Sequence, residues 1–85
     1  MASYRLLIKP SAAKELEDLP LKERKRVAAR IQRLASDPRP AGAEKLSGQD
    51  KYRLRQGNYR VLYSVDDAGM TVLVVKIGHR REVYR

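Results

Sequence analysis

Residues 51–63 have the sequence KYRLRQGNYRVLY, in which apolar and basic residues alternate on both sides of a glycine. Alternation with a period of two is the pattern of a strand with one buried face. Gly57 and Asn58 are a two-residue connection of the kind that joins antiparallel strands. With this turn, Gln56 faces Tyr59, and the pairing continues outward from them. The segment therefore predicts a β-hairpin with a defined register.

The predicted hairpin has one apolar face and one basic face. The apolar face, which must lie on the core, comprises Tyr52, Leu54, Val61 and Tyr63. The basic face comprises Lys51, Arg53, Arg55 and Arg60. Like charges that face each other, such as Arg55 and Arg60, destabilise a sheet. Local stability therefore does not explain this arrangement.

The basic face has two interpretations. It is either a solvated surface that is kept charged to prevent edge-to-edge aggregation, or a surface that binds phosphate groups. Clustered cationic side chains with no acid among them suit a phosphodiester and stabilise charge that develops on it. A face held together by salt bridges would carry both signs of charge. The sequence therefore favours phosphate binding.

Two more strands are expected around the hairpin. A second tight-turn signal, Asp-Asp-Ala-Gly at residues 66–69, is followed by a strand over residues 70–77. Two successive tight turns between such strands predict an antiparallel meander. The nearly unbroken apolar run Val72–Val75 predicts a central strand that is covered on both faces. Near the N-terminus, Tyr4–Lys9 alternates as a half-buried strand does.

Two helices are expected between the first strand and the hairpin. Ser11 is the predicted N-cap of a helix over residues 12–19. Pro20 ends this helix and serves the first turn of a second helix, which runs to about Ala35. The apolar stripes are Ala12, Leu16 and Leu19 in the first helix and Val27, Ile31 and Leu34 in the second. The sequence thus predicts an α+β fold, in which an N-terminal strand and a helical hairpin pack on a small, mainly antiparallel four-stranded sheet.

Length and composition narrow the class of protein. The 85 residues suit a single domain over residues 1–85, with a shallow active site at most. Nineteen Lys and Arg against ten Asp and Glu give a formal net charge of +9, which favours nucleic acid or an acidic protein as partner. With no cysteine and one histidine, neither a disulfide, a metal site nor a cofactor is expected. No apolar run approaches the roughly 20 residues of a membrane-spanning helix, and no signal-peptide pattern is present, so we expect a cytoplasmic protein without a membrane partner.

The second predicted helix carries basic residues of its own. Arg26, Arg30 and Arg33 are spaced three and four residues apart, so they form a stripe. The stripe is either a solvated helix face or a second anchor for an extended RNA backbone.

The end of the chain contains two candidate acid–base residues. His79 belongs to the residue type whose ordinary pKa lies nearest neutrality, so it is a candidate for proton transfer; otherwise it is a surface or capping histidine. Tyr84 either covers the edge of the core or, with its pKa lowered by nearby arginines, deprotonates a hydroxyl group.

A series of short motifs runs along nearly the whole chain. The motifs are Tyr4-x-Leu6, Ala13-Lys14-x-Leu16-x-x-Leu19, Asp37-Pro38, Lys45-Leu46-Ser47-Gly48, residues 52–63, and Gly78-His79-Arg80-Arg81-x-Val83-Tyr84-Arg85. In this order they resemble the RelE/ParE toxin superfamily, and the hairpin and the Gly-His-Arg-Arg tail are the most specific of them. The resemblance implies a helical hairpin on a small antiparallel sheet, in agreement with the fold predicted from the pattern.

The resemblance also implies an activity. The concave face of the sheet would bind messenger RNA in the ribosomal decoding site, where the 2′-hydroxyl attacks its own phosphate and a cyclic phosphate is left. The chain would then be an endoribonuclease, an mRNA interferase that inhibits translation. The family's catalytic positions fall on Arg53, Arg55, Arg60, Arg80 and Tyr84. Further RNA contacts are expected from Lys51, Arg26, Arg30, Arg33 and Arg81.

At two catalytic positions the chain departs from the best-known members, which have lysines where Arg53 and Arg55 stand. Arginine holds its proton too tightly to act as a base, so these residues are expected to stabilise charge. Tyr84 or His79 remains as the base. We expect Tyr84, because the resemblance places a catalytic tyrosine at that position.

The expected partners follow from the same resemblance. They are a cognate acidic RelB-like antitoxin, bound in a hetero-oligomeric complex, together with messenger RNA and the 70S ribosome. One alternative is a ParE-like protein that inhibits DNA gyrase and has no nuclease activity. Another is an RNA-binding module without catalysis. The convergent arginines and the tyrosine favour RNA cleavage over both.

Overall fold

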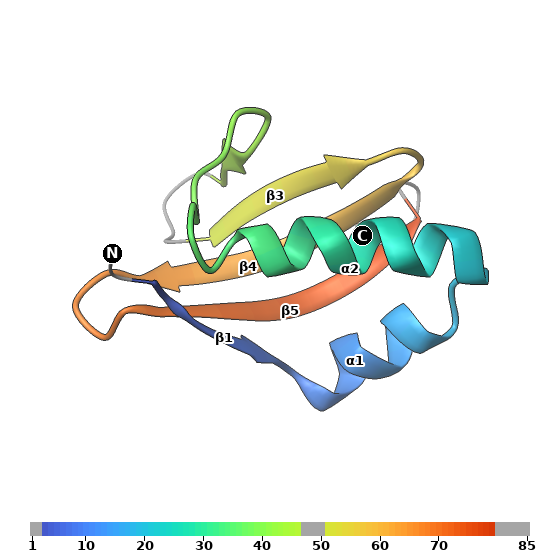
Figure 1. Cartoon of the computed structure of the whole chain (residues 1–85), viewed down its shortest axis with the longest axis horizontal. Helices are drawn as coiled ribbons and strands as arrows, with labels where there is room; N and C mark the ends of the chain where they lie inside the picture. The colour runs from blue at the N-terminus through green and yellow to red at the C-terminus, as the bar shows by residue number, and fades with distance from the viewer. Residues whose placement is uncertain (1–2, 47–50, 80–85) are drawn as a thin grey trace.

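The computed structural model describes residues 3–46 and 51–79, which form two helices and five strands (Figure 1). In chain order these are β1 (Arg5–Ile8), α1 (Pro10–Glu17), α2 (Leu21–Arg33), β2 (Glu44–Lys45), β3 (Lys51–Gln56), β4 (Tyr59–Asp66) and β5 (Thr71–His79). The strands form one sheet in the order β1-β5-β4-β3-β2. β1 runs parallel to β5, and the other neighbours are antiparallel. The α+β prediction is confirmed, but β2 adds a fifth strand that the sequence pattern did not predict.

The β3–β4 hairpin has the predicted register. Gln56 pairs with Tyr59 and Arg55 pairs with Arg60, as the two-residue turn requires. Gly57 has φ of +60°, a left-handed conformation that glycine adopts without a steric penalty. A positive φ at the first central residue alone is the mark of a type II′ turn, whose twist matches that of the strands.

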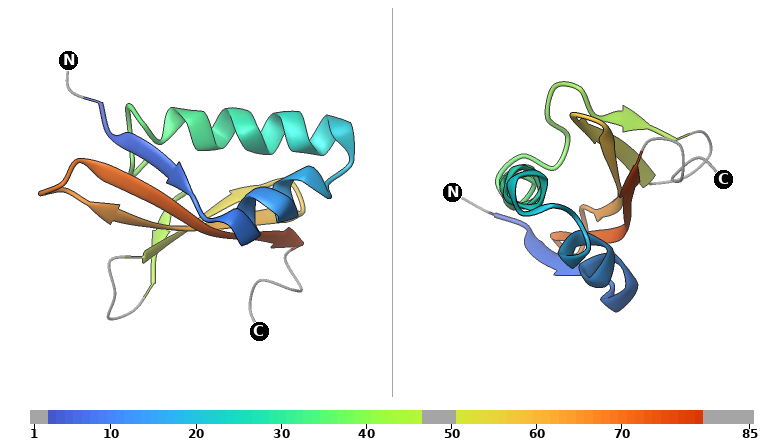
Figure 2. Two further views of the ribbon diagram at one scale, coloured as in Figure 1. Left: turned by 90° about the horizontal axis from the view of Figure 1, so that it is seen from below. Right: turned by 90° about the vertical axis from the view of Figure 1, so that its right-hand side faces the viewer.

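Both helices lie on the same face of the sheet (Figure 2). The core between the two layers comprises Ala12, Val27, Ile31, Leu34, Tyr52, Leu54, Val61, Tyr63, Val65, Val72, Val74 and Ile77. Every residue of the predicted apolar hairpin face is in this cluster. The face of the sheet that the helices cover is therefore the one that the alternation pattern assigned to the core.

The helix boundaries differ from the prediction at both ends. α1 begins at Pro10 and has Lys9 at its N-cap, so the predicted cap at Ser11 is wrong. Proline is well suited to the first helical position, where its fixed φ is already helical and its missing N–H would have no partner. α2 begins after Pro20 and ends at Arg33, slightly before the predicted Ala35.

A β-bulge changes the alternation within β5. Ile77 pairs with Val61, whereas Val74 pairs with Tyr63, so β5 has one residue more than β4 in this interval. The extra residue lets Val74 and Ile77 face the core together. β5 is central, as predicted, with Val72 and Val74 fully buried, but Leu73 and Val75 on its other face are only half-buried. The expected burial on both faces is therefore confirmed for one face only.

α1 protects the part of β5 that β1 does not reach. The pairing of β1 with β5 ends at Ile8 and Val74. Beyond this point the backbone N–H of Ile77 donates a hydrogen bond to Oε1 of Glu15 (3.0 Å), and Nζ of Lys76 lies 3.4 Å from Oε2 of the same side chain. A carboxylate on α1 therefore occupies the position of a missing strand.

Candidate nucleic-acid interface

The predicted basic residues of the hairpin lie on the face of the sheet that is turned away from the helices. Lys51, Arg53 and Arg55 alternate along β3 with Tyr52 and Leu54, which are buried beneath the helices. On β4, Arg60 lies directly opposite Arg55, so it shares their face. The structure therefore brings together four of the residues proposed from the sequence, and we call them the arginine face.

Exposure differs strongly along the arginine face. Lys51 and Arg55 are exposed, and Arg53 is half-buried. Arg60 is only 7% exposed, although it lies on the side away from the helices. Burial restricts the conformations of a guanidinium, so Arg60 is the most constrained cation of the face. Arg55 and Lys51 are the most accessible to a ligand.

The arginine face also contains an acid, contrary to the prediction that it would carry positive charge alone. β2 pairs with β3 so that Glu44 lies opposite Arg53. Oε2 of Glu44 accepts a hydrogen bond from Nη2 of Arg53 at 2.7 Å. The sequence pattern did not reveal this contact, because a strand of two residues has no measurable alternation and its partner strand begins only at Lys51.

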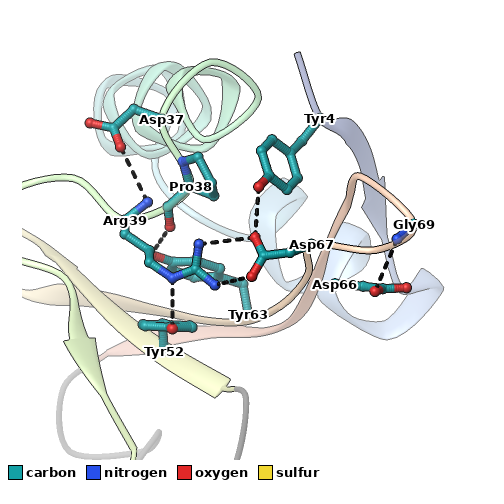
Figure 3. Close-up of polar contacts among 9 residues, drawn as sticks. All are labelled: Tyr4, Asp37, Pro38, Arg39, Tyr52, Tyr63, Asp66, Asp67 and Gly69. Carbon is teal, nitrogen blue, oxygen red and sulfur yellow. Dashed lines mark hydrogen bonds and ion pairs between the residues drawn. The ribbon is translucent and has the colours of Figure 1, made fainter. Parts of the chain in front are cut away.

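The loop that leads from α2 to β2 is fixed by Arg39 (Figure 3). The guanidinium donates to both carboxylate oxygens of Asp67, at 3.1 and 2.8 Å, and its Nε donates to the hydroxyl of Tyr52 at 2.8 Å. The hydroxyl of Tyr63 donates to the carbonyl of Pro38 at 2.8 Å, next to Arg39 in the chain. These bonds attach the loop to β3, to β4 and to the turn between β4 and β5. They thereby hold the start of β2 beside β3.

The same network shifts the ionisation of its members. Hydrogen bonds from Arg39 and then from Tyr4 lower the pKa of Asp67. The hydrogen bond to Asp67 in turn raises the pKa of Tyr4. Burial raises the pKa of Tyr63 to about 12. Both tyrosines therefore remain protonated at neutral pH, and their role is structural.

His79 lies on the other face of the sheet, away from the arginine face. It pairs with Tyr59 and makes an edge contact with the Tyr59 ring, with a centroid distance of 5.8 Å. Tyr59 packs against the core on the helix side. The two side chains line a pocket of about 400 Å³ together with Glu15 and Asp18 of the α1 region. The structure therefore does not bring His79 together with the arginines.

The basic stripe of α2 is also separate from the arginine face. Arg26 and Arg33 are exposed and Arg30 is half-buried, but α2 lies on the opposite side of the sheet. One strand of RNA would have to pass around the molecule to reach both surfaces. The remaining candidates, Arg80, Arg81 and Tyr84, lie outside the described residues.

No cluster of metal-binding side chains occurs within residues 3–46 and 51–79. In the same part of the chain, neither helix has the length and apolar character that a membrane crossing requires.

The fold and the arginine face together define a small α+β domain with a cationic sheet surface. Residues 6–84 match the model of the family described as ParE toxin of type II toxin-antitoxin system, parDE. The chain belongs to this family and, with it, to the RelE/ParE superfamily of toxins. The resemblance seen in the sequence motifs is thereby confirmed.

Solved structures of RelE proteins are similar to the chain over almost its whole length. In the RelBE2 toxin-antitoxin complex from Mycobacterium tuberculosis, the matching chain has a TM-score of 0.81 at 26% identity, with 93% of this chain and 100% of that chain covered. The archaeal RelE-RelB complex from Pyrococcus horikoshii OT3 gives 0.79 at 29% identity, covering 93% and 97%. The isolated E. coli RelE toxin gives 0.80 at 27%, covering 95% and 90%.

A shorter match is found with the toxin RelG of Mycobacterium tuberculosis (strain ATCC 25618 / H37Rv). It is 41% identical over 34 residues, which are 40% of this chain and 39% of that toxin. The aligned part thus spans well under half of RelG.

Proposed function

We propose that the chain is the toxin of a type II toxin–antitoxin pair and acts as an mRNA interferase in the cytoplasm. The observation that carries the proposal is the arrangement of Arg53, Arg55 and Arg60 on one sheet face. Opposed arginines weaken a hairpin, so the local stability of the hairpin does not explain them, and a negatively charged ligand would offset their repulsion. A phosphodiester supplies that charge. The similarity to RelE structures supports RNA as the source of the phosphate.

In the proposed reaction, the 2′-hydroxyl of a bound message attacks the adjacent phosphorus. A bond forms between the 2′-oxygen and phosphorus, and the bond from phosphorus to the 5′-oxygen of the next nucleotide breaks. That oxygen leaves as a hydroxyl group with a proton from water, and a 2′,3′-cyclic phosphate remains. Negative charge increases on the phosphoryl oxygens in the transition state, where guanidinium groups stabilise it. Arg53, Arg55 and Arg60 have this role, joined by Arg80.

Tyr84 is the proposed base that removes the 2′-hydroxyl proton. The position of His79 supports this choice, because His79 contacts Tyr59 on the helix side of the sheet. A base has to come within hydrogen-bonding distance of the proton that it removes. A phosphate held by the arginine face would be separated from His79 by the sheet itself.

The proposed partners are the ribosome with its message and an acidic RelB-like antitoxin. The M. tuberculosis relative was solved as a toxin-antitoxin complex, and the P. horikoshii relative as a RelE-RelB complex. A formal net charge of +9 makes an acidic partner the natural inhibitor, because such a partner would cover the surface that binds phosphate.

The experiment that tests the function measures cleavage of ribosome-bound message by the purified chain and its variants. Tyr84→Phe should reduce the cleavage rate roughly 10²- to 10⁴-fold and leave RNA binding nearly unchanged, as expected for loss of a general base. His79→Ala is the matched control and should cleave at nearly the wild-type rate. If His79→Ala abolishes cleavage and Tyr84→Phe does not, the base has been assigned to the wrong residue.

Inhibition of DNA gyrase is the second candidate function, because the matching family model is described as a ParE toxin. A supercoiling assay on the same preparation distinguishes the two. Gyrase inhibition by a chain that leaves ribosome-bound message intact would replace the proposal of RNA cleavage.

A further inference from the structure

The arginine face contains a carboxylate that the proposed cleavage reaction does not use. Glu44 lies opposite Arg53 in the β2–β3 pair, and their side chains are joined by a hydrogen bond of 2.7 Å. The Glu44 side chain is 59% exposed and that of Arg53 is 17% exposed. The acid is therefore the more solvent-exposed partner of the contact.

We propose that Glu44 competes with the RNA phosphate for Arg53 and so weakens RNA binding. The inference rests on the proposed function, in which Arg53 binds phosphate. Carboxylate and phosphate oxygens accept the same charge-assisted hydrogen bonds from a guanidinium. While Glu44 accepts a hydrogen bond from Nη2 of Arg53, that N–H cannot be given to a phosphate, and the negative charge of Glu44 repels one. A phosphate gains this N–H only when the carboxylate moves away.

The contact is of the kind that a ligand can displace. Glu44 is more than half exposed, and ion pairs with an exposed partner contribute little because water solvates the separated groups well. Its strand has two residues and lies at the edge of the sheet, so the side chain can rotate into solvent without disturbing a neighbouring strand.

The Arg39–Asp67 pair provides a contrast within the same molecule. There both carboxylate oxygens of Asp67 accept bonds from Arg39, and Tyr4 donates to the carboxylate as well. That pair holds a loop in place. Glu44 accepts a hydrogen bond from Arg53 through one oxygen, Oε2. It therefore restrains the Arg53 side chain only weakly, and its main effect is to reduce the positive electrostatic potential around that side chain.

The competition makes binding more selective. A chain of net charge +9 attracts any RNA, since release of counterions favours binding irrespective of sequence. RNA that cannot displace Glu44 loses one arginine contact. RNA that binds with a phosphate at Arg53 gains that contact. Glu44 therefore lowers the affinity most for RNA that binds loosely.

The test compares Glu44→Gln with Glu17→Gln in the full chain. Glutamine keeps the shape of glutamate and removes its charge, and Glu17 is an exposed acid of α1 on the helix side of the sheet. Affinity is measured by fluorescence anisotropy with a short 2′-O-methyl RNA, which binds but cannot be cleaved. Glu44→Gln should bind about two- to fivefold more tightly than the wild type, which is the range that the strength of exposed ion pairs allows. Glu17→Gln should bind like the wild type.

Two more measurements identify Arg53 as the group on which Glu44 acts. In an Arg53→Ala background, Glu44→Gln should give a smaller gain in affinity, because Glu44 then has no Arg53 donor to occupy and acts on the phosphate through its charge alone. In cleavage of ribosome-bound message, Glu44→Gln should lower KM and leave kcat unchanged. Replacing a residue that only supported the fold would change the free energy of unfolding and would not lower KM at unchanged kcat.

Several results overturn the inference. One is an affinity of Glu44→Gln no higher than that of Glu17→Gln, and another is a gain that is equally large without Arg53. Loss of kcat in Glu44→Gln would show that the carboxylate takes part in the reaction instead. If Arg53→Ala and Arg55→Ala weaken RNA binding while Glu44→Gln changes nothing, the role of Glu44 is wrong and the proposed phosphate surface still stands. If neither arginine variant weakens binding, the proposed phosphate surface fails and the inference with it.

Discussion

Replacing Arg55 with glutamine should make the protein more stable and less active at once. Arg55 is exposed and lies directly opposite Arg60 in the hairpin. Two unit charges about 6 Å apart in water repel by about 0.7 kcal/mol, and physiological salt roughly halves this value. Like charges at directly opposed sheet positions cost a similar amount, about 0.2–1 kcal/mol. Arg55→Gln removes the repulsion and keeps a long polar side chain on the strand.

The expected gain is about 0.5 kcal/mol in the free energy of unfolding, which corresponds to a rise in Tm of roughly 2–4 °C for a domain of this size. Thermal unfolding followed by circular dichroism measures the rise. Arg5→Gln serves as the control, because it removes the same charge from an exposed position of β1 where the facing residue is Thr71. In about 1 M salt, where charges are screened within about 3 Å, the gain of Arg55→Gln should disappear.

Cleavage of ribosome-bound message by Arg55→Gln should fall at every pH, because a charge stabiliser acts irrespective of the ionisation of the base. An Arg55→Gln variant with unchanged or lower Tm would show that Arg55 does not destabilise the hairpin. A more stable variant with full activity would show that the charge serves neither the fold nor the reaction. Either result refutes the argument that opposed arginines indicate a phosphate site.

Three further predictions concern the core and the Arg39 network. Asp67 has a lowered pKa, so its contribution to stability is fully present above its unfolded pKa near 3.8 and is lost as the pH falls through the lower folded pKa. The unfolding free energies of the wild type and Asp67→Asn, measured in urea from pH 7 to pH 2, should therefore converge in acid. Tyr63 has a pKa of about 12 in the folded chain, so the wild type should lose stability as the pH rises from about 10 to 12. Tyr63→Phe, which lacks the hydroxyl bonded to Pro38, should cost about 1 kcal/mol at neutral pH. It should also show a smaller alkaline loss, to which Tyr4 with its raised pKa still contributes, and equal pH dependence in the two proteins would contradict the assignment. Leu34→Ala should lower the unfolding free energy by about 2–5 kcal/mol in denaturant titrations, because the side chain is fully buried; a loss below 1 kcal/mol would mean that the core closes around the gap.

Local signals in the sequence were sufficient for the hairpin and the arginine face. The two-residue turn at Gly57 fixes the pairing of β3 with β4, and alternation then assigns every side chain to a face. Periodicity and turn signals also predicted the two helices and the strands around the hairpin, and the family resemblance agreed with that fold. The start of α1 was predicted wrongly, because Ser11 and Pro10 are both good N-terminal residues and the structure uses the proline.

Features that depend on contacts between distant segments could not be predicted. The position of Glu44 depends on a loop that Arg39 attaches to Asp67, and neither residue has a local pattern that indicates its partner. The burial of Arg60 and the location of His79 on the helix side depend on how the sheet is covered and on where the β5 bulge falls. Alternation counted from the sequence alone does not reveal an inserted residue.

The parallel pairing of β1 with β5 has a consequence for the time at which the chain acquires its structure. β1 is the first described strand to be synthesised, and its partner β5 is the last. Contacts between such distant segments form slowly, because a long loop must close before they are made. On the ribosome, β1 and α1 emerge early but have no sheet on which to pack until β5 has followed them. The hairpin that bears the arginine face likewise has an incomplete core until then, so a nascent chain completes the arginine face only after β5 has been synthesised.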